Sequence, residues 1–473
     1  MGDFTKNVNV NIELLKNRLR VDANFDMLTR RVKIGGRTAG FFFIDGFVQE
    51  AMVEMLMEFF YTLKEDDMKS LDTFLEVGMP YTEIDRSKDM NQVITKFLSG
   101  VSVMVIDGFD ECLMIDCRTY PMRSVTEPWK DRVLRGSRDG FVETLVSNVA
   151  LLRRRIRDTR FSVEMFNVGE RSRSDVAVCY IDDKVDRKLL DNIKKRIQSI
   201  EVESLTMNIE SIAECLFEHR WINPFPKFKY SERPDTASAA VLDGNIVIMV
   251  DNSPAVMIIP TSIFDLVEEA DDYNFAPLIG TYLRLIRFGF SLLTVILTPT
   301  WLLLVLNPDW VPQWLSFILV TDEITVPIVL QLILLELAVD GLKMAAVNTP
   351  TLLSTPLSII AGIVVGEYAV SSGWFNPEAL LYMAVVTVGT YSQANFEMGY
   401  ALKFVRVLTL CLTAIFNVWG YGAGILTGVI CVSFNKTISG KSYLYPIIPF
   451  DANMLKRSVF RVRLPHSSKK TGK

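Results

Sequence analysis

The chain has 473 residues, of which 49% are hydrophobic and 22% are charged, and its mean hydropathy is +0.25. This composition is too apolar for an ordinary soluble protein and too charged for a protein embedded wholly in a membrane. Residues 281–473 hold 14 Lys and Arg against 9 Asp and Glu, which leaves 36 against 46 for residues 1–280. An acidic soluble part therefore precedes a membrane part. The acidic balance disfavours nucleic acid as a partner, because binding nucleic acid requires a basic surface.

The sequence lacks the motifs of a metal centre or an enzyme. Its six cysteines form no CxxC pair and it has two histidines, so we expect neither a metal nor another cofactor. A P-loop, a GxSxG motif and an HExxH motif are all absent, which argues against an enzyme. The N-terminus lacks the basic and then apolar pattern of a cleaved export signal.

Short apolar runs that end in Asp recur in the soluble part and predict buried strands that lead into turns. They lie at Phe41–Gly46, Val103–Gly108, Leu113–Cys117, Val176–Asp183 and Val241–Asp251. Hairpins are expected around Gly108 and within Val241–Asp251. Amphipathic helices are predicted at Asn9–Phe25, Phe47–Leu63, Gly140–Arg157 and Asp186–Ile200.

This alternation predicts an α/β or α+β fold for the soluble part, with two subdomains that meet near Gly136–Asp139. The expected domains are two cytoplasmic subdomains at 1–136 and 137–273, an α-helical transmembrane domain at 274–435, and a basic cytoplasmic tail at 436–473. The basic cluster from Arg153 to Arg157 ends a predicted helix. Interleaved acids favour a solvated or subunit-contact role for this cluster over contact with anionic lipid.

The membrane part begins with Arg284 and Arg287, followed by the apolar run Phe288–Leu306, which is long enough to span a bilayer. The positive-inside tendency places these arginines, and hence the soluble part, in the cytoplasm. The tail from Lys456 onward is basic and is expected on the same side. Further hydrophobic blocks lie at Leu315–Val339, Pro356–Val370, Pro377–Val388 and Phe404–Phe434.

Two ends on one side require an even number of crossings, so one of the five blocks must be anomalous. Either the acidic block 324–343 is re-entrant or lies in the membrane plane, or Phe404–Phe434 breaks at Gly420–Gly422 into a hairpin. As a single helix, that run would be about 45 Å long, too long for one untilted crossing. We favour the anomalous acidic block, although this choice places Lys403 and Arg406 on the outer side.

The stretch Val326–Gly341 is almost purely apolar but carries Glu336 and Asp340 one helical turn apart, on one helix face. A carboxylate exposed to lipid costs roughly 2.5–3.5 kcal/mol, so these acids should face a protein interior, a cavity or the membrane interface. Rings of carboxylates select cations in channels. The candidates for lining an ion path are therefore Glu336, Asp340, Glu367, Asp322 and Glu323.

A structural role explains the same acids equally well. Asp340 can pair with Lys343, and Glu336 can reach the lipid headgroups. Small residues also recur every four positions, which allows helices to approach closely within one chain or between subunits. These residues are Gly362, Gly366, Gly420, Gly424 and Gly428.

Segments across nearly the whole chain resemble the A subunits of GerA-type spore germination receptors. In the soluble part they include Gly136, Arg138, Gly140, Arg153, Arg154, Arg155, Glu232, Arg233, Pro234 and Asp235. In the membrane part Pro327–Asp340 resembles the acidic segment of the family. The following Asp340–Ala346 departs from the usual A-subunit pattern, and together with Tyr445–Phe450 it resembles one branch of the family.

The resemblance implies a multi-pass protein of the spore inner membrane that acts in germination. Family A subunits are expected to form oligomers around an ion path and to work with permease-like and lipoprotein subunits. The departure after Asp340 weakens the expectation of direct nutrient sensing and implies a role in the release of ions or calcium-dipicolinate. A secondary transporter for dipicolinate or a similar anion, and a membrane scaffold or sensor without conduction, are the alternatives.

Overall fold

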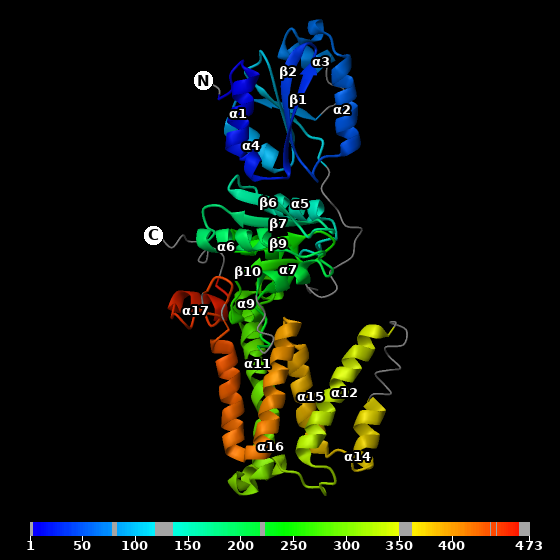
Figure 1. Ribbon diagram of the computed structural model, residues 1–473, viewed down its shortest axis with the longest axis vertical. Helices are drawn as coiled ribbons and strands as arrows, with labels where there is room; N and C mark the ends of the chain where they lie inside the picture. Colours follow the sequence, from blue (N-terminus) through cyan, green and yellow to red (C-terminus); the bar gives the residue numbers. More distant parts are fainter. Residues whose placement is uncertain are drawn as a thin grey trace. The chain divides into compact units, whose positions relative to one another are not determined.

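The computed structural model describes residues 3–77, 83–118, 136–217, 223–349, 362–435, 437–440 and 442–462. The chain divides into two compact units (Figure 1). Unit 1 comprises Met1–His219 and Phe228–Pro260, and unit 2 comprises Arg220–Lys227 and Thr261–Lys473. Part of the predicted block Pro356–Val370 and the tail beyond residue 462 lie outside the described residues.

Unit 1 begins with a five-stranded antiparallel sheet in the order β1-β2-β4-β5-β3. Its strands are β1 (Met27–Ile34), β2 (Arg37–Ile44), β3 (Ile84–Ser87), β4 (Ser102–Ile106) and β5 (Cys112–Ile115). Helices α1 (Val8–Leu19) and α4 (Met90–Leu98) share a core with one face, while α2 (Glu50–Thr62) and α3 (Leu71–Val77) share a core with the other. Because helices cover both faces, every residue of the inner strands β4 and β5 is buried, whereas the edge strands β1 and β3 keep exposed residues.

The strand β4 shows this double burial clearly. Val103 and Val105 belong to the core under α1 and α4, whereas Met104 and Ile106 belong to the core under α2 and α3. Continuous apolar runs therefore encode the strands of this sheet. The predicted hairpin around Gly108 is confirmed, because β4 pairs with β5 across that turn.

A second five-stranded antiparallel sheet has the order β6-β7-β9-β10-β8. Its strands are β6 (Phe161–Val168), β7 (Ser174–Ile181), β8 (Lys229–Ser231), β9 (Ile246–Val250) and β10 (Val256–Ile259). Helices α5 (Leu145–Arg155) and α8 (Pro234–Leu242) share its hydrophobic core, and α6 (Arg187–Gln198) lies against β6 and α7 (Ile209–Leu216). Unit 1 is thus α+β, one of the two predicted classes.

The predicted hairpin within Val241–Asp251 is wrong. Val241 lies in the last turn of α8, which Pro234 begins at a first-turn position that proline favours. The strand that follows, β9, pairs with β10 further along the chain.

Unit 2 is helical. Its described elements are α9 (Ile263–Val267), α10 (Asp271–Asn274), α11 (Pro277–Leu306), α12 (Ile328–Asn348), a π-helix (Gly362–Tyr368), α14 (Ala369–Ser371), α15 (Pro377–Tyr391), α16 (Phe396–Ser433) and α17 (Ala452–Val459). Two described helices, α11 and α16, are long and apolar enough to cross a membrane. The segment 261–273, which the sequence assigns to the second soluble subdomain, packs with unit 2 because Asp272 pairs with two arginines of α11.

The element α16 consists of two helices joined at Asn417, whose φ of 52° and ψ of −128° are not helical. Figure 1 shows the two halves side by side, and Gly424 and Gly428 on the second half face Thr409 and Val405 on the first. Asn417 exchanges amide hydrogen bonds of 2.7 and 3.0 Å with Asn307, at the end of α11.

This hairpin matches the alternative expectation, a break within Phe404–Phe434. It lies in the long run Phe404–Phe434, three residues before the expected Gly420, and not in the acidic block that we favoured. The acidic residues lie instead on α12, a regular helix of 21 residues, about 31 Å long. The requirement for an even number of crossings therefore no longer favours an anomalous acidic block.

Candidate functional site

A cluster of four ionisable side chains lies among the helices of unit 2. Helix α12 contributes Glu336 and Asp340, one turn apart, and the first half of α16 contributes Lys403 and Arg406. The side chain of Glu336 is 4% exposed and that of Arg406 is 2% exposed. Four charges thus face one another where the surrounding helices are otherwise mostly apolar.

Arg406 donates two parallel hydrogen bonds to the carboxylate of Glu336. Its Nε donates to Oε1 at 2.6 Å and its Nη2 donates to Oε2 at 2.9 Å. The remaining Nη1 donates at 3.0 Å to the carbonyl oxygen of Thr294 on α11. A bidentate pair of this kind fixes the relative orientation of the two side chains and also neutralises their charges. With the bond to Thr294, Arg406 links α11, α12 and α16.

Lys403 bridges the two acids of α12. Its Nζ lies 3.3 Å from Oε2 of Glu336, donates to the backbone carbonyl of Glu336 at 3.2 Å, and pairs with Oδ2 of Asp340. The other oxygen of Asp340, Oδ1, is buried and has no hydrogen-bond partner among the described residues. Asp340 therefore has one carboxylate oxygen that accepts no hydrogen bond from the described residues.

The neutralisation proposed for these acids occurs, but with different partners. Lys343, the expected partner of Asp340, places its ammonium over the rings of Tyr391 and Tyr400, at 4.7 and 5.2 Å from their centroids. Glu336 is held in the interior by Arg406 rather than reaching outward. From the sequence, Lys403 and Arg406 bore only on which side of the membrane this part of the chain lies, and neither was expected to pair with these acids.

The other predicted ion-path acids lie elsewhere. Asp322 and Glu323 are exposed in the segment before α12, whereas Glu336 and Asp340 lie in its middle turns. Glu367 is exposed in the π-helix Gly362–Tyr368. Within one chain, the structure brings together only Glu336 and Asp340 of the five candidates.

The predicted packing glycines divide into two sets. Gly420, Gly424 and Gly428 are buried and hold the two halves of α16 together; a Cβ on Gly424 would lie 2.6 Å from Oγ1 of Thr409. Among the described residues, no atom lies within 4 Å of the position that a Cβ would occupy on Gly362 or Gly366. The first set therefore serves packing within the chain, and the described residues show no such contact for the second set.

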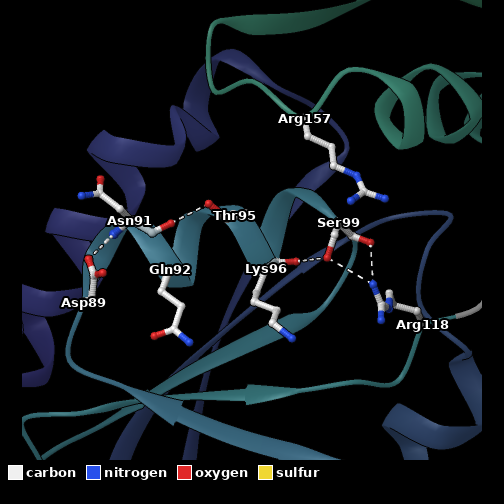
Figure 2. Close-up of a pocket in the computed structure, with 8 residues that line it drawn as sticks. All are labelled: Asp89, Asn91, Gln92, Thr95, Lys96, Ser99, Arg118 and Arg157. Atoms are coloured by element: carbon white, nitrogen blue, oxygen red, sulfur yellow. Dashed lines mark hydrogen bonds between the residues drawn. The ribbon is translucent and has the colours of Figure 1, made fainter.

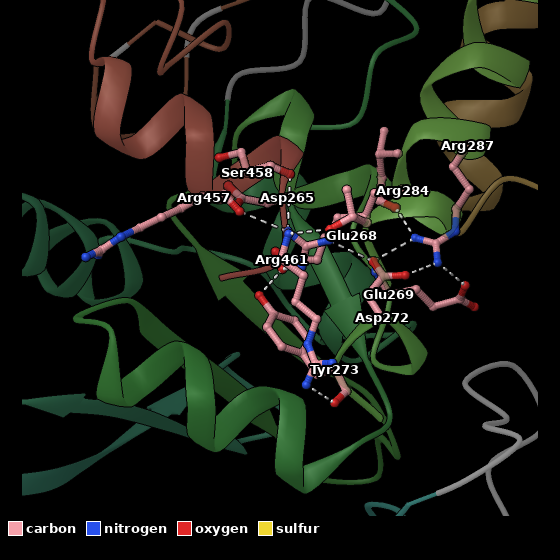
Figure 3. A network of polar contacts seen from close by, with 12 residues as sticks. Asp265, Glu268, Glu269, Asp272, Tyr273, Arg284, Arg287, Arg457, Ser458 and Arg461 are labelled. Atoms are coloured by element: carbon pink, nitrogen blue, oxygen red, sulfur yellow. Dashed lines mark hydrogen bonds and ion pairs between the residues drawn. The ribbon is translucent and has the colours of Figure 1, made fainter. Parts of the chain in front are cut away.

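A second polar network lies around the start of α11 (Figure 3). Asp272, which is fully buried, pairs with both Arg284 and Arg287. Arg284 also pairs with Glu268, and Arg287 lies 3.3 Å from Glu269. The two arginines that precede the apolar run Phe288–Leu306 are thus buried. Their charges are compensated by acids whose contact with them was not expected from the sequence.

The family segments of unit 1 make mainly structural contacts. Arg153 is fully buried and donates to Asp26 and to Asn24, so the solvated interpretation is wrong for this residue, while Arg154 is exposed. The guanidinium of Arg153 also lies over the ring of Phe161, 4.6 Å from the ring centroid.

The two family segments at 136–140 and 232–235 meet in space. Arg233 donates to the carbonyl of Ser137 at 3.1 Å and pairs with Asp235 at 2.6 Å, while Pro234 begins α8. The backbone N–H of Phe141 donates to the carbonyl of Glu232, and Gly136 has a φ of 133° that few other residues adopt. Arg138 and Gly140 lie on the same connecting segment.

Arg155 pairs with Asp139 at 2.7 Å. Burial acts to raise the pKa of Asp139, but hydrogen bonds from Ser137 and Arg155 outweigh burial, so the pKa lies below its usual value. Asp139 therefore remains ionised well into acid.

A polar cavity of about 550 Å³ in unit 1 was not anticipated from the sequence (Figure 2). Its residues come from α4 and its ends, with two arginines from beyond β5 and α5. They are Asp89, Asn91, Gln92, Thr95, Lys96, Ser99, Arg118 and Arg157. Three cationic side chains and one carboxylate line it, and two of the cations have acidic partners outside the lining: Arg118 pairs with Asp116, and Lys96 lies 3.6 Å from Asp85.

The comparisons with known proteins agree with the sequence motifs. The protein-family model described as Bacillus/Clostridium GerA spore germination protein matches residues 12–472 of this chain. The chain belongs to the GerA family of spore germination proteins. This GerA-family chain is 36% identical to stage V sporulation protein AF of Bacillus subtilis (strain 168) over 457 residues, which cover 96% of this chain and 92% of that protein.

Spore germination protein KA of the same organism is 24% identical over 461 residues, covering 95% of this chain and 84% of that protein. Among solved structures, the N-terminal domain of the A subunit of the Bacillus megaterium spore germinant receptor GerK3 aligns with a TM-score of 0.42 and 23% identity, covering 54% of this chain and 95% of that chain. The predicted family is confirmed, and the branch that the sequence resembles is that of stage V sporulation protein AF.

Proposed function

We propose that this GerA-family chain is a non-enzymatic, multi-pass protein of the spore inner membrane that forms an oligomer and conducts ions during germination. Unit 1 lies in the cytoplasm in this proposal. The observation that carries the proposal is the cluster of Glu336, Asp340, Lys403 and Arg406 among apolar helices. Ionisable groups are costly inside a membrane and are characteristic of ion paths.

Within the cluster we assign different roles to the two acids. Glu336 is saturated by Arg406 and Lys403 and serves to position the helices. Asp340 has an open acceptor atom and is the group that an ion would meet. Asp322, Glu323 and Glu367 are exposed in the single chain and are free to line the path once copies assemble.

The relatives are named as germination and sporulation proteins, which supports a place in the same process. We propose that the chain acts with other spore membrane proteins, such as permease-like and lipoprotein subunits. Its conduction would then contribute to the release of ions and calcium-dipicolinate.

Cation flux through liposomes that contain the full chain tests the proposal. Asp340→Asn keeps the shape of the side chain and removes its charge, so it should reduce flux while the assembly remains intact. Asp309→Asn, an exposed acid in the segment after α11, is the matched control and should leave flux unchanged. Equal flux from Asp340→Asn and the unaltered chain would remove Asp340 from the path.

A sensor without conduction is the second candidate, and the polar cavity of unit 1 favours it. Dipicolinate, an aromatic dianion, is a suitable probe for a cavity lined by Lys96, Arg118 and Arg157. Saturable binding to the full chain in detergent that Arg157→Glu abolishes, together with the absence of flux, would favour the sensor over the channel.

A further inference from the structure

Residues 447–450, just before α17, form an exposed apolar stretch. Ile447, Ile448 and Phe450 are 44%, 53% and 71% exposed, and Met454 and Phe460 beside them are 38% and 47% exposed. None of the residues of α17 is buried. Adjacent large apolar side chains on a surface mark a place where another apolar phase or partner is bound.

This segment is fixed beside the start of α11. Arg284 donates from Nη1 to the carbonyl oxygens of Arg457 and Ser458, at 3.0 and 3.2 Å (Figure 3). The backbone N–H of Arg461 donates to Oγ1 of Thr281 at 3.1 Å, and its guanidinium donates to the carbonyl of Tyr273 at 2.6 Å. The end of α17 therefore has a defined height along α11.

That height corresponds to the headgroup layer of a bilayer. The apolar run of α11 begins at Phe288, and Arg284 and Thr281 precede it by about 6 and 10 Å of helix. The headgroup region on each side of a bilayer is roughly 5–8 Å thick. The contact to Arg284 thus falls within a layer of this thickness and the contact to Thr281 just outside it, so the end of α17 is held at the outer edge of the lipid headgroups.

The charge of the segment fits anionic lipid. Lys456 and Arg457 lie on α17, and the sequence from Ala452 to the C-terminus contains no Asp or Glu. In the described part of the chain, neither Lys456 nor Arg457 forms an ion pair through its side chain. A short cationic helix next to exposed Ile and Phe side chains is the composition of an interfacial anchor.

We propose that Ile447–Phe450 and α17 form an anchor that inserts its apolar side chains into the leaflet beside the start of α11 and binds anionic phospholipid through Lys456 and Arg457. The proposal rests on the membrane placement of α11 and is independent of whether the protein conducts ions. A second copy of the chain, which could also cover this surface, is an outcome that the experiment separates.

Hydrogen–deuterium exchange of the full chain tests the anchor in three environments: neutral detergent, phosphatidylcholine nanodiscs and nanodiscs with phosphatidylglycerol. Amides of residues 447–460 should exchange more slowly in nanodiscs than in detergent, and most slowly with phosphatidylglycerol. At about fivefold for each cation near an anionic surface, the two cations should slow exchange about 25-fold more with phosphatidylglycerol than with phosphatidylcholine. Lys456→Glu combined with Arg457→Glu reverses both charges and should remove this whole difference. Exchange in α11 provides the internal check that the membrane unit is folded and inserted.

Ile448→Ser combined with Phe450→Ser should remove the slowing in both kinds of nanodisc. Lys188→Glu combined with Lys195→Glu, two exposed cations of α6 in unit 1, is the control and should change nothing at 447–460. Equal exchange of 447–460 in all three environments would overturn the proposal. Slowing in detergent that grows with protein concentration would overturn it too, because it would identify a second copy as the occupant.

Discussion

Arg153 in unit 1 and Arg406 in unit 2 are both buried against a carboxylate, but their surroundings differ. Arg153 binds Asp26, Asn24 and the carbonyl of Phe161, and it lies over the ring of Phe161. One acid faces one base there. Around Arg406, by contrast, a second base and a second acid are present, and Oδ1 of Asp340 has no partner among the described residues.

The pair in unit 1 is a cross-link between its two sheets. Asn24 forms a β-bridge with Val163 of β6, and Asp26 immediately precedes β1. Such a closed pair holds two layers in place and has no capacity for another ion. The cluster in unit 2 combines a closed pair, Arg406 with Glu336, and an open pair, Lys403 with Asp340. Burial of charge alone is therefore poor evidence for function, whereas an unpaired acceptor beside buried charge is better evidence.

Breaking the pair in unit 1 should have the largest effect. Asp26→Ala leaves Arg153 buried without its counter-charge and should destabilise unit 1 by about 3–5 kcal/mol. Faster amide exchange in β6 of the full chain would report this loss. Asp26→Leu combined with Arg153→Met should recover most of the stability, and a double variant no more stable than Asp26→Ala would contradict the cross-link.

Breaking the pair in unit 2 should have a somewhat smaller effect. Glu336→Ala leaves Arg406 uncompensated among apolar helices, which costs about 2.5–3.5 kcal/mol on insertion scales. The midpoint of thermal unfolding in detergent should fall accordingly. A double-mutant cycle with Arg406→Leu separates the pair from its surroundings, and additive losses would show that the two side chains do not stabilise each other.

The hairpin of α16 can be tested through its glycines. Gly424→Val places methyl groups where Thr409 already lies, so it should cost about 1–3 kcal/mol by overpacking. Gly422→Val on the same half of α16 is the matched control, because among the described residues no atom lies within 4 Å of the position that its Cβ would occupy. Thermal unfolding should separate the two variants, and equal midpoints would argue against close packing of the two halves of α16.

The smallest effect is expected for Asp139. Its ion pair with Arg155 is partly exposed and should contribute about 0.2–1 kcal/mol. Because folding lowers the pKa of Asp139, this contribution is complete above its ordinary value of 3.8 and is lost as the pH falls through the folded value. Asp139→Asn should therefore matter at pH 7 and matter progressively less as the pH falls below 3.8, as measured by exchange in α5. A difference that does not shrink with falling pH would assign the effect to shape.

Much of unit 1 could be predicted because local pattern and burial agree there. The runs at Phe41–Gly46, Val103–Gly108 and Val176–Asp183 are strands in the structure. The failure at Val241 came from reading an apolar residue before Asp-Gly as strand, although Pro234 at the first turn of a helix was an available signal.

The site was only half predictable. The spacing of Glu336 and Asp340 follows from helical geometry, but their partners lie more than sixty residues away on α16. No local pattern carries that pairing. Asn417 was also overlooked beside the glycines, although Asn adopts positive φ more readily than most residues, and the nearby glycines are needed for contact between helices.

The mutual amide bonds of Asn307 and Asn417 determine where the chain can accept an added tag. An insertion at Asn417 would break both hydrogen bonds and separate the halves of α16. The neighbouring segment from Asp309 to Thr325 is largely exposed, with Trp314 and Phe317 at 75% and 73% exposure. The turns around Trp314 and Phe317 form a 3-10 helix, Gln313–Ile318, whose last carbonyl accepts a hydrogen bond from Trp301. An epitope placed after it, between Glu323 and Ile324, which are exposed and outside any helix, should therefore be displayed without disturbing the bundle.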